Sequence, residues 1–432
     1  MNCEKIILSV GVYMSKITVN GGNKIFGELA VQGAKNSVLP VLAGSILCKG
    51  NCVIHNCPRL SDVETSIKIL TGLGASCLRD ENTVIVDSTE ISDYKIPEQL
   101  MREMRSSVVF LGAIIGRTGK AVISSPGGCE LGPRPIDLHL SSLEKLGVNI
   151  REEHGFLYCD TPKGLKGAEI HLSFPSVGAT ENIILAAATA KGVTVIHNAA
   201  KEPEISDLAD FLNSAGAKIY GSGSDTIYIH GVNSLGSTEH TIIPDRIVAC
   251  TYMAAAAITN GEIILKGVMP SHMVAILSVF RESGCKISVS GKSLKLTARD
   301  RITRVPTIRS LVYPAFPTDA GPLVIAMLSC AKGTSVFVEN IFENRFRYID
   351  ELNRLGTKIK TEGKIAIIEG VDKLSGAGCK CTDLRGGAAL VLAGLRAKGK
   401  TVIGDIQHIE RGYEDIVENL KLLNADIEYT ED

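Results

Sequence analysis

Hydrophobic and polar positions follow a pattern that recurs six times along the chain. In each repeat a glycine precedes a short run of β-branched residues, as in KGNCVIHN, TGKAVISS, KGVTVIHN, NGEIILKG, KGTSVFVE and KGKTVIGD. These glycines lie 66 to 73 residues apart, at Gly50, Gly119, Gly192, Gly261, Gly333 and Gly399. Each run predicts a buried strand that starts at a tight turn.

A second phrase closes an amphipathic segment 23 to 28 residues after each of these glycines. The phrases are LTGLGASC, LEKLGVNI, LNSAGAKI, FRESGCKI, LNRLGTKI and LKLLNADI, anchored at Gly74, Gly147, Gly216, Gly284, Gly356 and Asn424. Glycine and asparagine tolerate the left-handed conformation that ends a helix. The unit is therefore strand, helix, cap and strand. Apolar segments such as 176–190 and 247–257 predict further helices between the units.

Alternation of strands and helices predicts an α/β protein. Six units of about 70 residues are too many for one hydrophobic core, so we expect two lobes of three units. The midpoint falls at Pro244, Asp245 and Arg246. A substrate site is expected in the cleft between two such lobes. The alternative reading of the repetition is a single open sheet or a solenoid.

Composition narrows the class of partner. The 432 residues carry a net charge of −1, which does not suggest a nucleic acid or an anionic membrane as partner. Aromatic residues make up 5% and tryptophan is absent, which argues against a stacking surface for single-stranded nucleic acid. No apolar run reaches the ~18 residues of a membrane span. We therefore expect a protein that acts on small molecules in the cytoplasm.

Twelve cysteines are scattered through apolar segments, which is typical of reduced core thiols in a cytosolic protein. Two groups have close spacing, namely Cys48, Cys52 and Cys57, and the pair Cys379 and Cys381. Neither has a matching histidine pair or a second CxxC motif, so we predict no metal site. Residues 1–14 are expected to be an N-terminal tail or to follow an upstream start, with Met14 as an alternative start.

Irregular segments between the repeats carry the candidate chemistry. Lys35 and Asn36 stand at the start of an apolar helix, where free N–H groups and the helix dipole favour an anion. A capped helix with an exposed lysine is the alternative. The glycine- and proline-rich stretch SSPGGCELGPRPIDLH predicts a loop long enough to be a lid, and Cys129 within it lies near cations that favour a reactive thiol. An ordinary surface loop is the alternative there.

Arginines recur in comparable segments of several units. Because arginine suits bidentate recognition of carboxylate and phosphate, they predict a shared polyanion site. The residues are Arg105, Arg134, Arg345, Arg385 and Arg411.

Eleven short motifs stand in one order along the chain: GAKNS, MRSS, PGGC, GPRPIDLH, SVGAT, EPEI, PDRI, FPTD, FENRF, TDLR and RGYE. From about Lys16 to the C-terminus the chain thereby resembles the UDP-N-acetylglucosamine 1-carboxyvinyltransferase family, the enolpyruvyl transferases of bacterial cell-wall synthesis. The resemblance implies two inside-out α/β barrel domains, each of three βαβαββ-type units, with the active site between them. It also implies a first domain at 35–243, carrying the lid, and a second at 15–34 plus 244–432.

The resemblance implies four catalytic residues. Cys129 corresponds to the lid cysteine, which is the family's proton donor and the target of fosfomycin. Asp319 corresponds to the carboxylate on the sugar 3′-hydroxyl, and Lys35 and Arg411 to cations that stabilise the departing phosphate. The same thiol, as a thiolate, can also form a covalent phospholactoyl adduct.

Substrate-binding positions follow from the same motifs. They comprise the cations that bind the phosphate and carboxylate of phosphoenolpyruvate, the segment that lines the uridine, the turn that faces its diphosphate, and one backbone contact to the UDP-sugar. In this chain they are Lys35, Asn36, Arg105, Arg134, Pro135, Ile136, Asp137, Leu138, Ser176, Val177, Gly178, Asp319, Ile341, Arg345, Arg385 and Arg411. The chain departs from the family at Phe174 and Pro175, where a lysine often precedes the SVGAT motif, and at Glu410, where an aspartate is common.

The implied reaction moves the enolpyruvyl group of phosphoenolpyruvate to the 3′-hydroxyl of UDP-N-acetylglucosamine and releases phosphate, the first committed step of peptidoglycan synthesis. No step requires a metal or a redox cofactor, so we expect none. One alternative is the shikimate 3-phosphate enolpyruvyl transferase, against which the PGGC and GPRPIDLH motifs argue. The other is a catalytically idle paralogue that binds the UDP-sugar.

Overall fold

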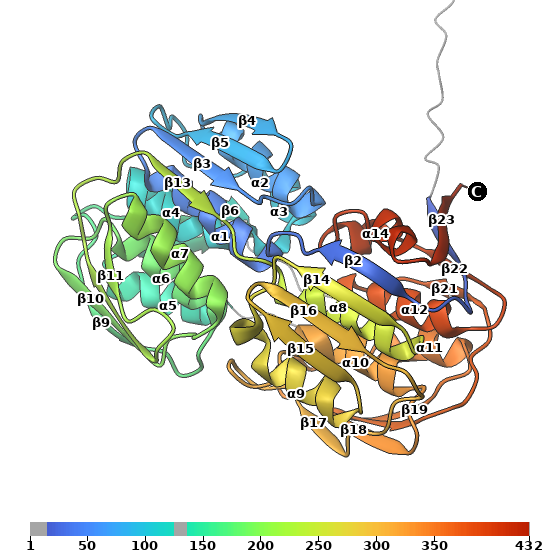
Figure 1. Ribbon diagram of the computed structural model, residues 1–432. Helices are drawn as coiled ribbons and strands as arrows, with labels where there is room; N and C mark the ends of the chain where they lie inside the picture. Colours follow the sequence, from blue (N-terminus) through green and yellow to red (C-terminus); the bar gives the residue numbers. More distant parts are fainter. Residues whose placement is uncertain (1–14, 125–135, 432) are drawn as a thin grey trace, which may run out of the picture.

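The computed structural model describes residues 15–124 and 136–431, which form two lobes side by side (Figure 1). One hydrophobic core is built from residues 34–243 and the other from residues 17–31 together with 247–427. We call the parts around these cores the first and the second lobe. The finer domain limits that the sequence suggested, 35–243 and 15–34 plus 244–432, stay a prediction, and the tail at 1–14 lies outside the described residues.

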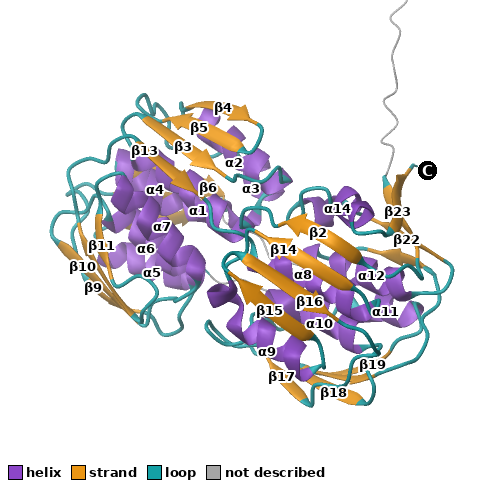
Figure 2. Ribbon diagram, in the orientation of Figure 1, coloured by secondary structure: helices purple, strands orange, loops and turns teal. Residues whose placement is uncertain are grey.

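Three helices form the centre of each lobe, and the sheets lie outside them (Figure 2). These helices are buried nearly all round, since every residue of α10 and 12 of the 13 residues of α8 are buried. A helix that is apolar on all sides belongs inside a protein core, and this explains runs such as VACTYMAAAAI. The inner helices are α1 (Lys35–Gly44), α4 (Phe110–Thr118), α6 (Val177–Ala187), α8 (Arg246–Ile258), α10 (Gly321–Leu328) and α12 (Leu384–Arg396).

Three sheets surround the helices of the first lobe. In each, the strand after a repeat glycine pairs in parallel with a segment on one side and antiparallel with a later hairpin on the other. The first sheet is β13 (Thr238–Thr241), β3 (Asn51–His55), β5 (Thr83–Asp87) and β4 (Ser76–Asp80); the second is β6 (Lys120–Ser124), β8 (Phe156–Asp160) and β7 (Asn149–Glu153); the third is β9 (Glu169–His171), β10 (Val193–His197), β12 (Thr226–His230) and β11 (Lys218–Tyr220).

The second lobe repeats this arrangement, and its strand order confirms the inside-out fold with three units per lobe. Its sheets are β2 (Phe26–Ala30), β14 (Glu262–Lys266), β16 (Ser293–Thr297) and β15 (Lys286–Ser290); β17 (Thr307–Arg309), β18 (Thr334–Val338), β20 (Ile365–Glu369) and β19 (Lys358–Glu362); and β21 (Gly378–Lys380), β22 (Lys400–Gly404), β1 (Lys16–Asn20) and β23 (Asp426–Thr430). Six separate sheets exclude the single open sheet.

Helices with one buried and one exposed face cover the edges of the lobes. They are α2 (Ser61–Gly72), α3 (Glu98–Glu103), α5 (Asp137–Lys145), α7 (Pro203–Ser214), α9 (Val274–Glu282), α11 (Ile349–Arg354), α13 (Gln407–Glu410) and α14 (Ile416–Leu422). Among the described helices, none has the length and apolar character needed to span a membrane.

The chain crosses between the lobes twice. It begins in the second lobe, where β1 lies between β22 and β23 and runs antiparallel to both. It enters the first lobe just before Lys35 and returns just before Arg246, and the two crossing segments pair at Gly33 and Pro244. Helices α1 and α8 therefore both begin at the junction of the lobes.

The helix-ending anchors have the backbone conformation that the repeat predicted. All six are left-handed, with φ between 71° at Asn424 and 106° at Gly74 and Gly216. Gly261 differs from the other strand-starting glycines, because the left-handed residue there is Asn260, with φ 55°. A Cβ on Gly261 would lie 2.0 Å from the carbonyl oxygen of Ile25, so close packing rather than backbone conformation requires glycine at this position.

Candidate active site at the junction of the lobes

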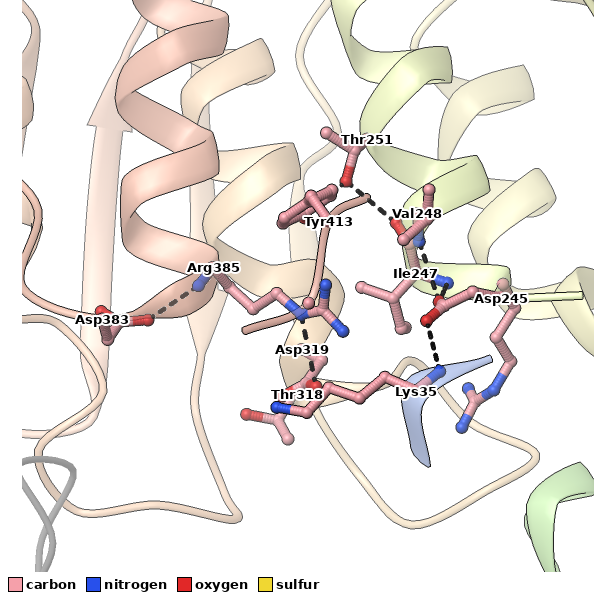
Figure 3. Close-up of polar contacts among 12 residues, drawn as sticks. Lys35, Asp245, Ile247, Val248, Thr251, Thr318, Asp319, Asp383, Arg385 and Tyr413 are labelled. Carbon is pink, nitrogen blue, oxygen red and sulfur yellow. Dashed lines mark hydrogen bonds and ion pairs between the residues drawn. The ribbon is translucent and has the colours of Figure 1, made fainter. Parts of the chain in front are cut away.

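Asp245 fixes the starts of α1 and α8 with one carboxylate (Figure 3). Its Oδ1 accepts hydrogen bonds from the backbone N–H groups of Ile247, at 2.8 Å, and Val248, at 3.0 Å. Its Oδ2 accepts the backbone N–H of Lys35 at 3.2 Å. Capping of this kind satisfies N–H groups that a helix start leaves without partners. Asp245 therefore ties the first turn of α1 to the second lobe.

Lys35 and Arg411 meet at Asp62, which lies in α2. The Lys35 Nζ is 2.7 Å from Oδ2 of Asp62, and the Arg411 Nε and Nη2 are 3.0 and 3.3 Å from its two oxygens. Lys35 is 8% exposed and Asp62 is 1% exposed. Since Arg411 follows α13 of the second lobe, this ion-pair group joins the two lobes.

A second charged group lies in the second lobe beside the first. Asp319, half-buried in the short 3-10 helix Thr318–Ala320, has its Oδ1 3.0 Å from Nη2 of Arg345 and its Oδ2 3.5 Å from Nε of Arg385. Figure 3 shows the side chain of Lys35 pointing toward Asp319 and Arg385, and the charge of Arg385 lowers the pKa of Lys35 in addition to the larger effect of burial. The structure thus brings Lys35, Asp319, Arg345, Arg385 and Arg411 together.

Arg385 is held at the start of α12, where Asp383 caps the helix. The Asp383 Oδ1 accepts the backbone N–H of Arg385 at 3.0 Å. The guanidinium lies over the ring of Tyr413, 5.3 Å from its centroid. Burial raises the pKa of Tyr413, so this ring meets the arginine as a neutral phenol. Arg385 is 1% exposed, yet its Nε, Nη1 and Nη2 find no hydrogen-bond partner among the residues that the structure describes.

Glu339 orders the loop that carries Ile341. Its Oε1 accepts the backbone N–H of Ile341 at 2.7 Å, and its Oε2 lies 2.8 Å from the hydroxyl of Thr318, the neighbour of Asp319. This glutamate is 1% exposed. Because one carboxylate binds both groups, Glu339 fixes the position of the Ile341 backbone relative to the turn that precedes Asp319.

In the first lobe, α5 and α6 begin beside each other. Ile136, Asp137 and Leu138 lead into α5, and Ser176, Val177 and Gly178 form the start of α6, where the Ser176 Oγ accepts the N–H of Ala179 at 3.3 Å. A Cβ on Gly178 would approach His139 to 2.9 Å. The structure thus joins the two segments that the sequence assigned to the uridine and the diphosphate. Phe174, at the position where the family often has lysine, is exposed.

Three of the predicted site residues, Cys129, Arg134 and Pro135, lie outside the described residues. Arg105 belongs to the 3-10 helix Arg105–Val109, and its side chain is likewise outside what the structure describes. Asn36 is exposed at the first turn of α1. The roles assigned to all these residues stay predictions.

Comparison with known proteins identifies the family to which the chain belongs. The sequence model described as EPSP synthase (3-phosphoshikimate 1-carboxyvinyltransferase) matches residues 19–420, nearly the full chain. The chain belongs to the EPSP synthase family. This agrees with the six-unit architecture and with the resemblance seen in the motifs.

Within this family, the chain is similar over almost its full length to curated proteins that share one name. It is 52% identical over 414 residues to UDP-N-acetylglucosamine 1-carboxyvinyltransferase 2 of Caldanaerobacter subterraneus, covering 96% of this chain and 99% of that protein. It is 46% identical over 422 residues to UDP-N-acetylglucosamine 1-carboxyvinyltransferase 1 of Staphylococcus aureus, covering 97% and 100%. The solved enolpyruvyl transferase NikO from Streptomyces tendae superposes with a TM-score of 0.88 at 25% identity, covering 97% and 100%.

Several residues of this family member's site were not predicted from the sequence. Asp245 and Tyr413 belong to the motifs PDRI and RGYE, so the motifs alone could have drawn attention to them. Glu339 directly follows the repeat strand β18 and has no such signal. Asp62 lies in an ordinary amphipathic helix and contacts Arg411 across 349 positions of sequence, so only the fold reveals it.

His139 gives the first lobe a testable pH dependence. Burial lowers its pKa to about 4, although Asp137 acts in the opposite direction. The side chain is 7% exposed, and its Nδ1 is 2.9 Å from Nδ2 of Asn182. The folded protein holds His139 in its neutral form. The burial of this neutral side chain therefore contributes its full stability above the unfolded-state pKa of about 6.5, and the contribution is lost as pH falls toward the folded-state pKa.

We expect His139→Gln, which cannot titrate, to remove this dependence. The unfolding free energy of the wild type should lose up to about 3 kcal/mol relative to the variant between about pH 6.5 and pH 4. Denaturant unfolding across this range measures the difference, and His230→Gln at an exposed histidine is the control. A difference that stays constant with pH would contradict the assignment.

Proposed function

We propose that this protein transfers the enolpyruvyl group of phosphoenolpyruvate to the 3′-hydroxyl of UDP-N-acetylglucosamine and releases phosphate. The observation that carries the proposal is the buried Arg385 guanidinium, whose three nitrogens make no hydrogen bond to any described residue, beside the buried ammonium of Lys35. Buried hydrogen-bond donors without an acceptor decrease the stability of the folded protein, unless a bound ligand supplies the acceptor. The names of the curated relatives supply the acceptor.

The cations suit a substrate that carries phosphate and carboxylate close together. Lys35, Arg385 and Arg411 come from both lobes, so a ligand that binds all three must lie between the lobes. Charge-assisted hydrogen bonds contribute roughly 1.5–3 kcal/mol each. Arg345 has a different task, because its Nη2 binds Asp319 and fixes that carboxylate.

In the addition step, a proton goes to C3 of phosphoenolpyruvate and the sugar oxygen bonds to C2. We assign the proton to the Cys129 thiol by resemblance, and the Asp319 carboxylate takes the proton of the 3′-hydroxyl. Arg345 and Arg385 contact this carboxylate and orient it. The product of the step is a tetrahedral ketal that still carries the phosphate.

In the elimination step, the C2–O bond to phosphate breaks and C3 returns a proton to the Cys129 thiolate, which restores the double bond, while the proton held by Asp319 leaves with the phosphate. Lys35 and Arg411 stabilise the charge that develops on the leaving phosphate. Atoms and charge balance without a redox change. We further propose that the reaction takes place in the cytoplasm, a proposal that rests on the cysteine usage of the sequence.

Phosphate release tests the proposal directly. Purified protein is given phosphoenolpyruvate with either UDP-N-acetylglucosamine or shikimate 3-phosphate as acceptor. We expect release with the UDP-sugar alone. Cys129→Ala should reduce it by at least about 100-fold, within the usual range for general acid–base catalysis. Cys77→Ala, which changes a half-buried thiol of β4, is the matched control and should keep the rate.

Two other outcomes contradict the proposal. Release with shikimate 3-phosphate alone would assign the chain to the other branch of its family. Binding of the UDP-sugar without release from either acceptor would identify a catalytically idle paralogue.

A further inference from the structure

Asp62 is a buried carboxylate bound to cations that are expected to hold an anionic ligand. Its carboxylate contacts both Lys35 and Arg411, and its own side chain is 2% exposed. Arg411 is more open, at 30% side-chain exposure. A ligand can therefore reach the arginine while Asp62 stays behind it.

The charges around Lys35 explain why a carboxylate is needed here. Lys35 faces Asp62 from α2, Arg411 from the segment after α13 and Arg385 from α12, while Asp245 holds its backbone N–H. Burial lowers the pKa of Lys35, Asp62 opposes that effect, and both arginines add to it. Burial alone would raise the pKa of Asp62, but Lys35 and Arg411 outweigh it and hold the pKa below its ordinary value.

We propose that Asp62 is a positioning residue that keeps Lys35 protonated and holds Arg411 in place until the phosphate or carboxylate of the substrate takes over Arg411. The inference rests on the proposed function for the identity of that substrate. It adds to that function a description of how the anion binds: Arg411 exchanges its contact with the Asp62 carboxylate for a contact with the anionic group of the substrate. Asp62 itself does not touch the reacting atoms.

Removing the charge of Asp62 should make the site depend on pH. In Asp62→Asn the shape is kept, but Lys35 faces two arginines without its compensating carboxylate. Its pKa then falls further, so the lysine loses its proton at a pH where the wild type keeps it. A loss of structure, in contrast, would lower activity by a similar factor at every pH.

The test measures kcat/KM for phosphoenolpyruvate against pH in the full-length protein. We expect the ratio of wild type to Asp62→Asn to be several-fold larger at about pH 9 than at about pH 7, since a decrease of about one unit in the lysine pKa changes this ratio by at most about tenfold. Asp62→Glu, which keeps the charge, should retain the wild-type pH profile even where its KM changes. Asp372→Asn, at an exposed carboxylate paired with Arg301, is the control for charge alone.

Binding of inorganic sulfate separates this inference from the proposed function. Sulfate keeps its charge over this pH range, and its binding needs no turnover. If the wild type released no phosphate with either acceptor, the proposed function would fail, while a steeper loss of sulfate affinity with pH in Asp62→Asn would still support the role of Asp62. A ratio that does not change with pH, in turnover or in sulfate binding, overturns the inference. So does failure of both Asp62 variants to fold, since that outcome makes the residue structural.

Discussion

Arg385→Met should decrease kcat/KM for phosphoenolpyruvate at least about 100-fold and leave the ligand-free protein at least as stable as the wild type. The arginine is buried, and within the described part of the chain its three guanidinium nitrogens lack hydrogen-bond partners and its nearest carboxylate contact is Asp319 at 3.5 Å. Replacing buried charge by a well-packed apolar side chain is often neutral or stabilising by about 1–4 kcal/mol. Asp319 keeps its contact with Arg345 in the variant.

The loss of function has a separate origin. Two charge-assisted hydrogen bonds to the substrate, each contributing roughly 1.5–3 kcal/mol, correspond to a decrease of at least about 100-fold in kcat/KM for phosphoenolpyruvate. Thermal unfolding and steady-state kinetics on the same preparation measure both effects. Arg354→Met, at an exposed arginine of α11, is the matched control. A variant that is strongly destabilised, or that keeps wild-type kinetics, would show that Arg385 serves the fold rather than the ligand.

Asp319→Asn should lower kcat by about 10²–10⁴, the usual contribution of a positioned general base. The amide keeps the size of the side chain but accepts no proton from the sugar hydroxyl. Binding of UDP-N-acetylglucosamine, measured by calorimetry, should change much less than kcat. Because the nearly fully buried Arg345 loses its carboxylate partner, the unfolding free energy should also decrease.

Asp350→Asn provides the comparison for Asp319→Asn, since Asp350 is exposed on α11 in the same lobe. It should change neither kcat nor stability beyond about 0.5 kcal/mol. If kcat of Asp319→Asn fell less than tenfold, another group would have to take the proton. A fall in sugar binding equal to the fall in kcat would assign Asp319 to ground-state binding instead.

Much of the fold was predictable because each repeat carries its own local signals. Apolar runs at 176–190 and 247–257 predicted helices, and the structure has α6 at Val177–Ala187 and α8 at Arg246–Ile258. The helix-ending anchors need the left-handed conformation, which glycine and asparagine supply. Gly261 shows the limit of this reasoning, because its neighbour Asn260 has the positive φ and contact with Ile25 requires the glycine.

The site was predictable only in part. Lys35, Arg385 and Arg411 stand in recognisable motifs, so the sequence could name them. It could not show that Asp62 joins two of them, because that contact depends on how the lobes meet and has no local pattern. Asp245 likewise caps two helices at once only because the chain crosses between the lobes at Gly33 and Pro244.

Identification of the product tests the central claim most directly. Wild-type protein is incubated with phosphoenolpyruvate and UDP-N-acetylglucosamine, and the nucleotide sugar is then analysed by mass spectrometry and NMR. The account predicts an enolpyruvyl ether at the 3′-oxygen of the sugar, formed in equal amount with inorganic phosphate. Unchanged UDP-N-acetylglucosamine, or an enolpyruvyl group on a different oxygen, would contradict it.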